Sequence, residues 1–484
     1  MALSTKDLDA AIAATRFGLG ARPGEIATAS SDPRGWLKAQ IRKDGADRFQ
    51  SNGQTAPQRI ADLRDFQRER QQERRADAAQ AGADGAQPGK DPRDPVKMAQ
   101  RILREDTAGD FLARTQLGAT TDAGFRERWA LFWSNHFTVA AKNLQTATVV
   151  GPYENEAIRP HVFGPFVGLL MAVETHPAML IYLDQVQSIG PDSQIATGFG
   201  RRSPLGGRIQ PIANRKAGLN ENLAREIMEL HTVGVHGGYS QADVTEFARA
   251  MTGLSIAGPR DAVAPGTPIF RAIAHEPGAR TVMGVRYEAG GREQVAAILS
   301  DLAAKPQTAA FICTKIARHF VADDPPPALV ARLQRAWMNT GGDLGQVAQT
   351  LVEAPEAWDP KPRKFKTPYE FVVSSYRAAG LSPQAPPQVI PVLTGMGQKP
   401  FDPGSPKGWA EEADAWASPD GVIKRLQFAQ AFTGAATQGR DPNDLARQAL
   451  GGRMTAPTAA AIAKAESRPE GFALLLMSPE FQRR

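Results

Sequence analysis

The sequence predicts a mainly α protein, a multi-helical bundle-like architecture with one small β-hairpin. Apolar residues recur at helical spacing along most of the chain, helix-capping residues precede several of these stretches, and only one stretch has the composition of paired strands. With 484 residues and 42% hydrophobic content, the chain can bury a large core. We therefore expect one large helical domain over 1–484, or two tightly joined helical lobes.

Helical patterns dominate the first part of the chain. Between them, residues 68–96 are rich in charge and poor in apolar side chains, which predicts a mobile, low-complexity excursion at the surface. Residues 187–218 are rich in Gly, Arg and Pro and predict a long polar loop. The predicted helices of this part are 7–17, 33–42, 97–117, 122–135, 163–174 and 178–184.

The clearest pair of helices lies at 220–253. A stripe of Leu and Ile at i, i+4 and i+7 predicts a buried face on a helix over 221–233, and Gly234 suits its left-handed end. Ser240 and Asp243 have the spacing of an acidic capping box and start a second helix. The short Gly-rich connection brings the end of the first helix close to the start of the second.

A strand signal follows at 269–287. Residues 269–273 and 281–287 flank a turn at His275 and Gly278, and this arrangement predicts a β-hairpin. From 293 onward helical patterns return, interrupted by Pro-rich joints.

Composition and motifs exclude several classes of protein. The 57 basic and 51 acidic residues are evenly mixed, so the net charge of +6 implies no general affinity for nucleic acid. Cys313 is the only cysteine, which excludes an intrachain disulfide and a thiolate metal cluster. The sequence has no phosphate-binding Gly loop, nucleophile elbow or HExxH motif.

No apolar run reaches the length of a membrane span, and the first residues do not form a signal peptide. As given, the chain is expected to be cytoplasmic. A misassigned start codon would produce the same pattern, so a periplasmic location stays open.

The polar face of the 221–233 helix carries the strongest candidate site. Glu226 and Glu229 are one turn apart, and two inward-facing carboxylates at this spacing repel unless a cation, a proton or Arg225 lies between them. An acid/base pair or a metal site meets that condition. The spacing of Arg225 and Glu229 is equally that of an ordinary helix ion pair.

His136 ends an aromatic-rich helix, where a capping role competes with a functional one. We expect Glu226, Glu229 and His136 to be catalytic, and the same three residues would be the ligands of a divalent metal. The residues expected to bind substrate are Asn220, Asn222, Arg225, Tyr239 and His275.

The helix at 220–230, NENLAREIMEL, resembles a signature of the bacterial domain of unknown function 1800 family. Further segments resemble that family's signatures in the same order, over nearly the whole chain. These are ATRFGLGARPGEI at 14–26, RERWALFWSNHFTVA at 126–140, HPAMLIYLDQ at 176–185, FRAIAHEPGARTVMG at 270–284 and MGQKPFDPGSPKGW at 396–409. The resemblance implies a fold and a set of positions, without a reaction.

Two functions remain open. The carboxylate and histidine candidates favour a hydrolase-type enzyme, metal-assisted or not, that acts on a small-molecule or polymeric substrate. The alternative is a non-enzymatic helical accessory or scaffold protein of the cell envelope with a protein partner, in which the polar helix face is a buried packing network. DNA binding is disfavoured because Asp243 and Glu246 stand where a recognition helix needs basic side chains.

Overall fold

The computed structural model describes residues 5–84, 95–197, 218–437 and 439–484. These ranges contain 23 α-helices and two small antiparallel sheets of two strands each, which confirms the mainly α fold class. The helices are α1 (Thr5–Ile12), α2 (Glu25–Ala29), α3 (Pro33–Lys38), α4 (Ala56–Asp84), α5 (Pro95–Thr120), α6 (Gly124–His136), α7 (Leu144–Tyr153), α8 (Phe166–Glu174), α9 (Pro177–Tyr182), α10 (Gln194–Thr197), α11 (Asn222–Glu226), α12 (Gln241–Met251), α13 (Arg292–Ala304), α14 (Pro306–Phe320), α15 (Pro327–Thr340), α16 (Leu344–Glu353), α17 (Pro368–Ala379), α18 (Ile390–Gly395), α19 (Pro419–Ala436), α20 (Pro442–Leu450), α21 (Ala456–Ala463), α22 (Arg468–Met477) and α23 (Pro479–Gln482). The strands are β1 (Leu254–Ile256), β2 (Pro268–Phe270), β3 (Arg280–Val282) and β4 (Val285–Tyr287).

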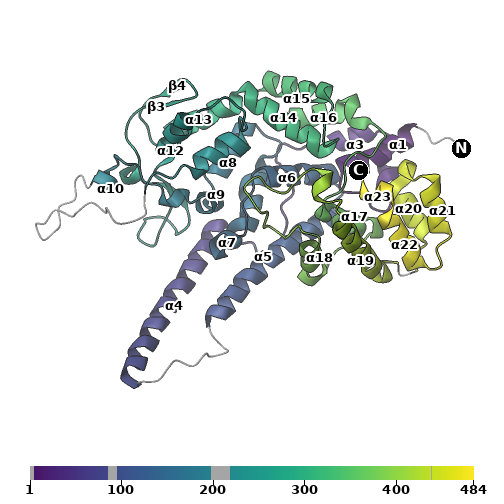
Figure 1. Cartoon of the computed structure of the whole chain (residues 1–484), viewed down its shortest axis with the longest axis horizontal. Helices are drawn as coiled ribbons and strands as arrows, with labels where there is room; N and C mark the ends of the chain where they lie inside the picture. Colours follow the sequence, from purple (N-terminus) through teal and green to yellow (C-terminus); the bar gives the residue numbers. More distant parts are fainter. Residues whose placement is uncertain (1–4, 85–94, 198–217, 438) are drawn as a thin grey trace, which may run out of the picture.

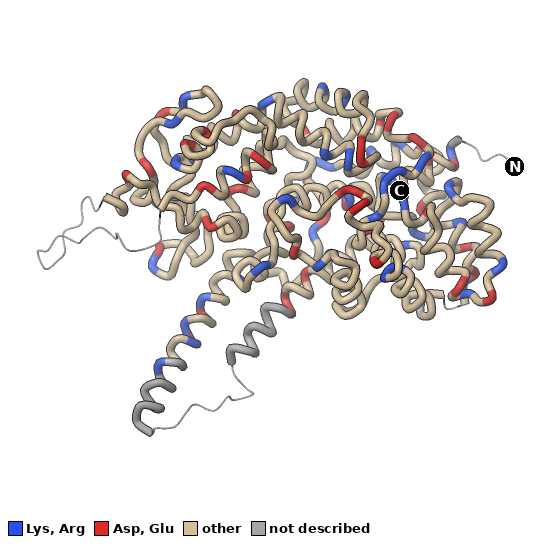
Figure 2. Tube along the Cα trace, in the orientation of Figure 1, with Lys and Arg blue, Asp and Glu red and all other residues tan. Residues whose placement is uncertain are grey.

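The helices form an elongated body, in which α6 lies near the middle (Figure 1). One end carries α8, α9, α12 and α13 with the strands β3 and β4, and the other end carries α19 to α23. Helices α14, α15 and α16 run along one edge between the two ends. Basic and acidic residues are interspersed over the body of the molecule (Figure 2).

Helices α4 and α5 extend away from this body as an arm (Figure 1). The expected charged excursion at 68–96 falls in this arm: residues up to Asp84 continue helix α4, and 85–94 lie outside the described residues. The expected polar loop at 187–218 is described up to Thr197, where it contains the short helix α10, and residues 198–217 lie outside the described part.

The helix pair at 220–253 forms as predicted. Helix α11 continues through a π-helical turn over Ile227–His231, and Gly234 then has a φ of +84°. Ser240 accepts a hydrogen bond from the backbone N–H of Asp243, whose side chain in turn accepts from the N–H of Ser240. This is the predicted capping box, and it fixes where α12 begins.

The predicted pairing of 269–273 with 281–287 is wrong. Strand β2 pairs backward with β1, and β3 pairs with β4. The β3–β4 turn contains Met283 and Gly284, both at positive φ, which suits a tight two-residue hairpin. Three-residue strands carry too little alternation for their partners to be identified from the sequence.

Buried apolar side chains from most helices join in one core cluster that runs from Ile12 to Phe481. Helix α17 lies inside it, and every residue of this helix is buried. Its start is fixed by a capping box between Thr367 and Glu370, and its end by Gly380 at a φ of +59°. Within the described ranges, no helix combines the length and the apolar character needed to cross a bilayer.

The core also encloses complete ion-pair networks. The side chain of Arg159 is fully buried and donates to the carboxylates of Glu127 at 2.7 and 2.8 Å and of Glu154 at 2.7 and 2.9 Å. Burial opposes the charge of Arg159, but the two carboxylates outweigh burial and raise its pKa. This network joins α6 to the turn that follows α7.

Replacing this arginine by a neutral residue should strongly destabilise the fold. Arg159→Met leaves two carboxylates buried without their partner, and we expect a loss of about 3–5 kcal/mol in the free energy of unfolding. Denaturant unfolding followed by circular dichroism measures the loss. The control is Arg286→Met, which removes an exposed pair with Glu288 and should cost less than about 1 kcal/mol. Equal losses in the two variants would contradict the structural role of the network.

Candidate functional site

The predicted polar face of α11 and its π-helical continuation is present and half-buried. Arg225 contacts Glu221 at 3.1 Å and Glu229 at 3.5 Å, and it donates to Gln241 at 2.9 Å. The phenol of Tyr239 hydrogen-bonds to Glu229. Burial, followed by this bond, raises the pKa of Tyr239 to about 12. Arg225, Glu229 and Tyr239 therefore lie together, and their expected roles stay predictions.

Glu226 lies beside this group. Burial is the largest cause of the raised pKa of Glu226, and the nearby Glu229 carboxylate adds to it, although His231 opposes the shift. Burial raises the pKa of the nearby Tyr182 to about 12, and the charge of Glu226 adds to this shift. A carboxyl with a raised pKa is suited to proton transfer.

The two asparagines expected to bind substrate, Asn220 and Asn222, lie at the start of α11. The side-chain oxygen of Asn220 accepts from the backbone N–H of Asn222 at 2.8 Å, and its amide donates to the carbonyl oxygens of Leu183 and Asp184. Asn220 thus caps the start of α11 and ties it to the end of α9. The side chain of Asn222 is exposed.

The ring of His136 contacts the end of this helix. Its two nitrogens bind His231 and Lys315 rather than Glu226 or Glu229. Its Nε2 lies 3.2 Å from the backbone oxygen of His231, and its Nδ1 lies 2.9 Å from the ammonium of Lys315. A carbonyl oxygen only accepts and an ammonium only donates, so the His136 ring is neutral with its proton on Nε2. Burial first, and then the Lys315 charge, lower the pKa of His136 well below its ordinary value.

The contacts given by the His275 side chain in the described residues are with Thr252, Phe270 and Gly290, and none is with this face. Its ring nitrogens lie 2.8 Å from the carbonyl oxygen of Thr252 and 2.7 Å from that of Gly290. These contacts tie the segment after β2 to the start of α13, which is a packing role.

The described residues contain no group of three or more His, Cys, Asp or Glu side chains that could hold a metal ion. Glu226, Glu229 and His136 are all described and do not form such a group. Their expected role as metal ligands stays a prediction.

A different cavity, of about 110 Å³, lies between α5, α6, α7, α17 and the 398–411 segment. Its lining includes the aromatic side chains of Phe111, Tyr153, Tyr369, Phe401 and Trp409, and Phe111 packs edge to face against both Tyr369 and Phe401. The guanidinium of Arg114 lies over the rings of Tyr369 and Phe401, 5.2 and 5.3 Å from their centroids. Polar and charged side chains line the cavity together with these apolar ones. Polar groups that converge on an apolar cavity are typical of a small-molecule site.

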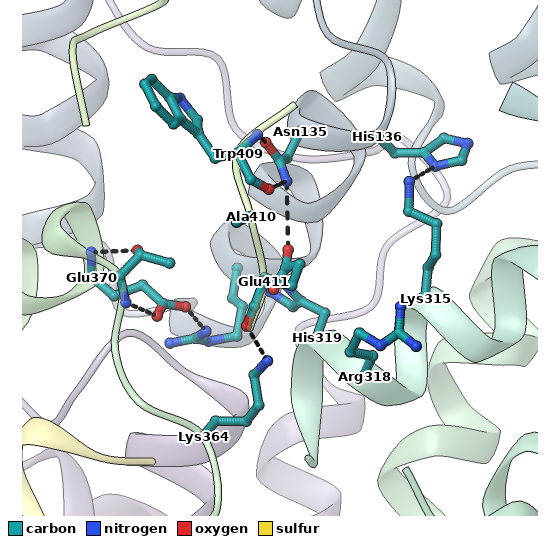
Figure 3. A network of polar contacts seen from close by, with 12 residues as sticks. Asn135, His136, Lys315, Arg318, His319, Lys364, Glu370, Trp409, Ala410 and Glu411 are labelled. Carbon is teal, nitrogen blue, oxygen red and sulfur yellow. Dashed lines mark hydrogen bonds and ion pairs between the residues drawn. The ribbon is translucent and has the colours of Figure 1, made fainter. Parts of the chain in front are cut away.

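One wall of this cavity holds a carboxylate–histidine pair that the sequence did not suggest. Nδ1 of His319, on α14, lies 2.8 and 3.0 Å from the two carboxylate oxygens of Glu411 (Figure 3). Nε2 of His319 is buried and has no hydrogen-bond partner in the described residues. Burial lowers the pKa of His319 even though Glu411 opposes the shift. In Glu411, burial is outweighed by His319, Lys364 and Arg484, which lower its pKa to about 2.

A second pair, Arg128 with Glu370, lies on the same cavity wall. The two side chains form a short ion pair, and Arg484 contacts the same Glu370 oxygen at 2.9 Å. Within the part of the chain that the structure describes, Nη2 of Arg128 has no hydrogen-bond partner. Burial, and then the neighbouring Arg484, lower the pKa of Arg128 to about 10. Nη2 of Arg128 is therefore a buried N–H donor that is available to a ligand.

The segment that carries Glu411 is fixed to α6. The backbone N–H of Trp409 donates to the side-chain oxygen of Asn135 at 2.7 Å, and the Asn135 amide donates back to the Trp409 carbonyl at 3.0 Å (Figure 3). Gly408 has a φ of +85°, and a Cβ there would lie 2.4 Å from the Asn135 carbonyl oxygen. Only glycine permits this approach.

Another carboxylate–histidine pair, His231 with Glu174, lies between the two regions. Nδ1 of His231 lies 2.8 Å from Glu174, and both side chains are 1% exposed. Nε2 of His231 and one oxygen of Glu174 are buried, and neither has a hydrogen-bond partner in the described ranges. The carbonyl of His231 binds His136, which in turn contacts Lys315 on the helix that carries His319.

The residues predicted from the sequence do not include His319, Glu411, Arg128 or Glu370, all of which line the cavity. A usable signal existed, because three segments that carry the family resemblance supply walls of the cavity. They are 14–26 with Leu19, 126–140 with Arg128 and Asn135, and 396–409 with Phe401 and Trp409.

The Glu411 carboxylate should make the free energy of unfolding depend on pH in the acidic range. Its pKa of about 2 lies below the ordinary 4.5, so its contribution is present above pH 4.5 and is lost as pH falls toward 2. Glu411→Gln removes this titration. The stability gap between wild type and variant should shrink by about 2 kcal/mol between about pH 6 and pH 3, measured by urea unfolding. Glu288→Gln, at an exposed pair, is the control. An unchanged gap would show that Glu411 is not held ionised by its partners.

The family model described as Protein of unknown function (DUF1800) matches residues 12–483. No curated protein and no solved structure matches the chain. The match spans all the segments whose resemblance was noted in the sequence, and it covers nearly the full length. The chain belongs to the DUF1800 family.

Proposed function

We propose that the protein is a hydrolase-type enzyme whose reaction takes place in the cavity between α5, α6, α17 and the 398–411 segment. The observation that carries the proposal is the Glu411–His319 pair at the cavity wall, where Nε2 of the imidazole has no hydrogen-bond partner among the described residues. A carboxylate bound to Nδ1 and an unengaged Nε2 are the arrangement of a histidine general base.

The protonation states support this role. Burial lowers the pKa of His319, so the imidazole is neutral near pH 7, while the low pKa of Glu411 keeps its carboxylate ionised. The Nδ1–H of His319 then donates to Glu411, and the lone pair of Nε2 is available. Glu411 orients the ring and stabilises the imidazolium that forms when Nε2 takes a proton.

The nucleophile in this proposal is a water molecule, because no side chain of the described residues hydrogen-bonds to Nε2. Nε2 takes a proton from water as the water oxygen attacks the electrophilic carbon. The imidazolium later returns that proton to the leaving group, so the step is balanced. The free Nη2 donor of Arg128 would stabilise the negative charge on the substrate oxygen.

The cavity size and its aromatic walls favour a small ester or amide with an apolar acyl group. The acid/base role expected for Glu226 stays a prediction, since its half-buried carboxyl has the raised pKa that such a role needs. Its face does not line this cavity.

The test is a panel of chromogenic esters, amides, phosphate esters and glycosides assayed with wild type and His319→Asn. We expect hydrolysis in the ester or amide class and a fall in kcat of at least about 100-fold in the variant, since general-base catalysis contributes at least that much.

The matched control is His176→Asn. His176 also pairs with a carboxylate, Glu156, at 3.1 Å, but it caps α9 and does not line the cavity. Asparagine preserves such a cap, so the control should keep its activity within about threefold. Wild-type activity that survives in folded His319→Asn would overturn the proposal. A protein inactive on the whole panel would favour the scaffold alternative.

A further inference from the structure

Lys315 is a half-buried amine that the proposed hydrolytic reaction does not use. It lies on α14, one turn before His319, and its Nζ is 2.9 Å from Nδ1 of His136 (Figure 3). The ring of Phe311, one turn earlier on α14, has its centroid 5.5 Å from Nζ. The amine therefore has one specific polar partner and an aromatic neighbour.

His136 can only accept from this amine. Its Nε2 carries the proton that binds the His231 carbonyl, so Nδ1 presents a lone pair to Lys315. The ring itself is held between Trp133 and Phe137, with centroids 5.5 and 4.6 Å away. A neutral lysine amine keeps one N–H on Nδ1, and this bond directs its own lone pair away from the histidine.

The surroundings also raise the fraction of neutral amine. Burial is the largest cause of a lowered Lys315 pKa of about 8. The cations Lys407 and Arg318 add to this shift, and Glu411 and Glu412 oppose it. An ordinary lysine has a pKa near 10.4, so Lys315 has about 100-fold more free amine near pH 7 to 8.

We propose that Lys315 is a nucleophilic amine that forms an imine with small aldehydes or ketones, and that His136 is its positioning residue. The arrangement of a nucleophile, a hydrogen-bonded histidine and a third group that orients the histidine is the pattern of an activated nucleophile. A lysine in a desolvated place next to other cations is the form that this pattern takes for carbonyl substrates.

The chemistry balances without an added oxidant or metal. The ammonium first loses a proton to solvent, and the nitrogen lone pair then attacks the carbonyl carbon to give a carbinolamine. Loss of one water forms the C=N bond. The inference is independent of the proposed hydrolase, because Lys315 does not line the cavity and the test needs no hydrolytic substrate.

The test uses the full chain with propanal as the probe and sodium cyanoborohydride to trap the imine as a secondary amine, at about pH 7.5. Peptide mass spectrometry then compares labelling rates among lysines. We expect Lys315 to react at least about tenfold faster than the exposed Lys38 and Lys399, whose side chains are 42% and 62% accessible. Equal or slower labelling of Lys315 in the folded protein overturns the proposal.

Two variants separate the roles. Lys315→Arg keeps the charge and should lose the fast-reacting site while retaining the circular dichroism spectrum of the wild type. His136→Asn should stay folded and slow labelling at Lys315 by about fivefold or more, with no change at Lys399. An unchanged Lys315 rate in folded His136→Asn would contradict the positioning role. Fast labelling that persists elsewhere after Lys315→Arg would contradict the assignment to Lys315.

Discussion

The structure depends on the pairing of buried arginines. A guanidinium is never neutral under ordinary conditions, so each one enclosed by the core must bind carboxylates or carbonyl oxygens. Arg377 binds Glu25 and the carbonyl of Gly20, hundreds of residues away in the chain, while Arg16 binds the carbonyls of Ala357 and Lys361. These bonds fix α17 and the preceding segment against the N-terminal helices. A shift of either element would leave a buried arginine without its partners.

The cavity lies where two such networks meet. Arg128 and Glu370 form one wall, and Arg114 with Glu154 contributes to another. Because these charges already serve the fold, the polar groups of the cavity are held in place before any ligand arrives. Preorganised groups of this kind stabilise charge without reorganisation, which is the property that catalysis requires. The same pairing that stabilises the fold therefore supplies the electrostatics of the proposed site.

Local patterns in the sequence predicted local structure. The capping box at Ser240, the helix end at Gly234 and the aromatic helix α6 all formed, because each depends on residues a few positions apart. The pairing of β1 with β2 could not be found, since three-residue strands have no readable period.

The candidate site residues also differ in whether the sequence could relate them to one another. Arg225, Glu229 and Tyr239 come together because one helix and its turn carry them. His319 and Glu411 are 92 residues apart, and no local pattern relates an α14 histidine to a carboxylate in an irregular segment. Such a pair becomes visible only when the tertiary packing is known.

The most direct test of the account is the protonation state of His319. Nitrogen-15 NMR of protein labelled at its seven histidines, with His319 assigned by the loss of its signals in His319→Asn, reports the tautomer and charge of the ring. The account predicts a neutral ring at pH 7 with the proton on Nδ1 and an unprotonated Nε2. A doubly protonated ring at pH 7, or a neutral ring with its proton on Nε2, would contradict a general base oriented by Glu411.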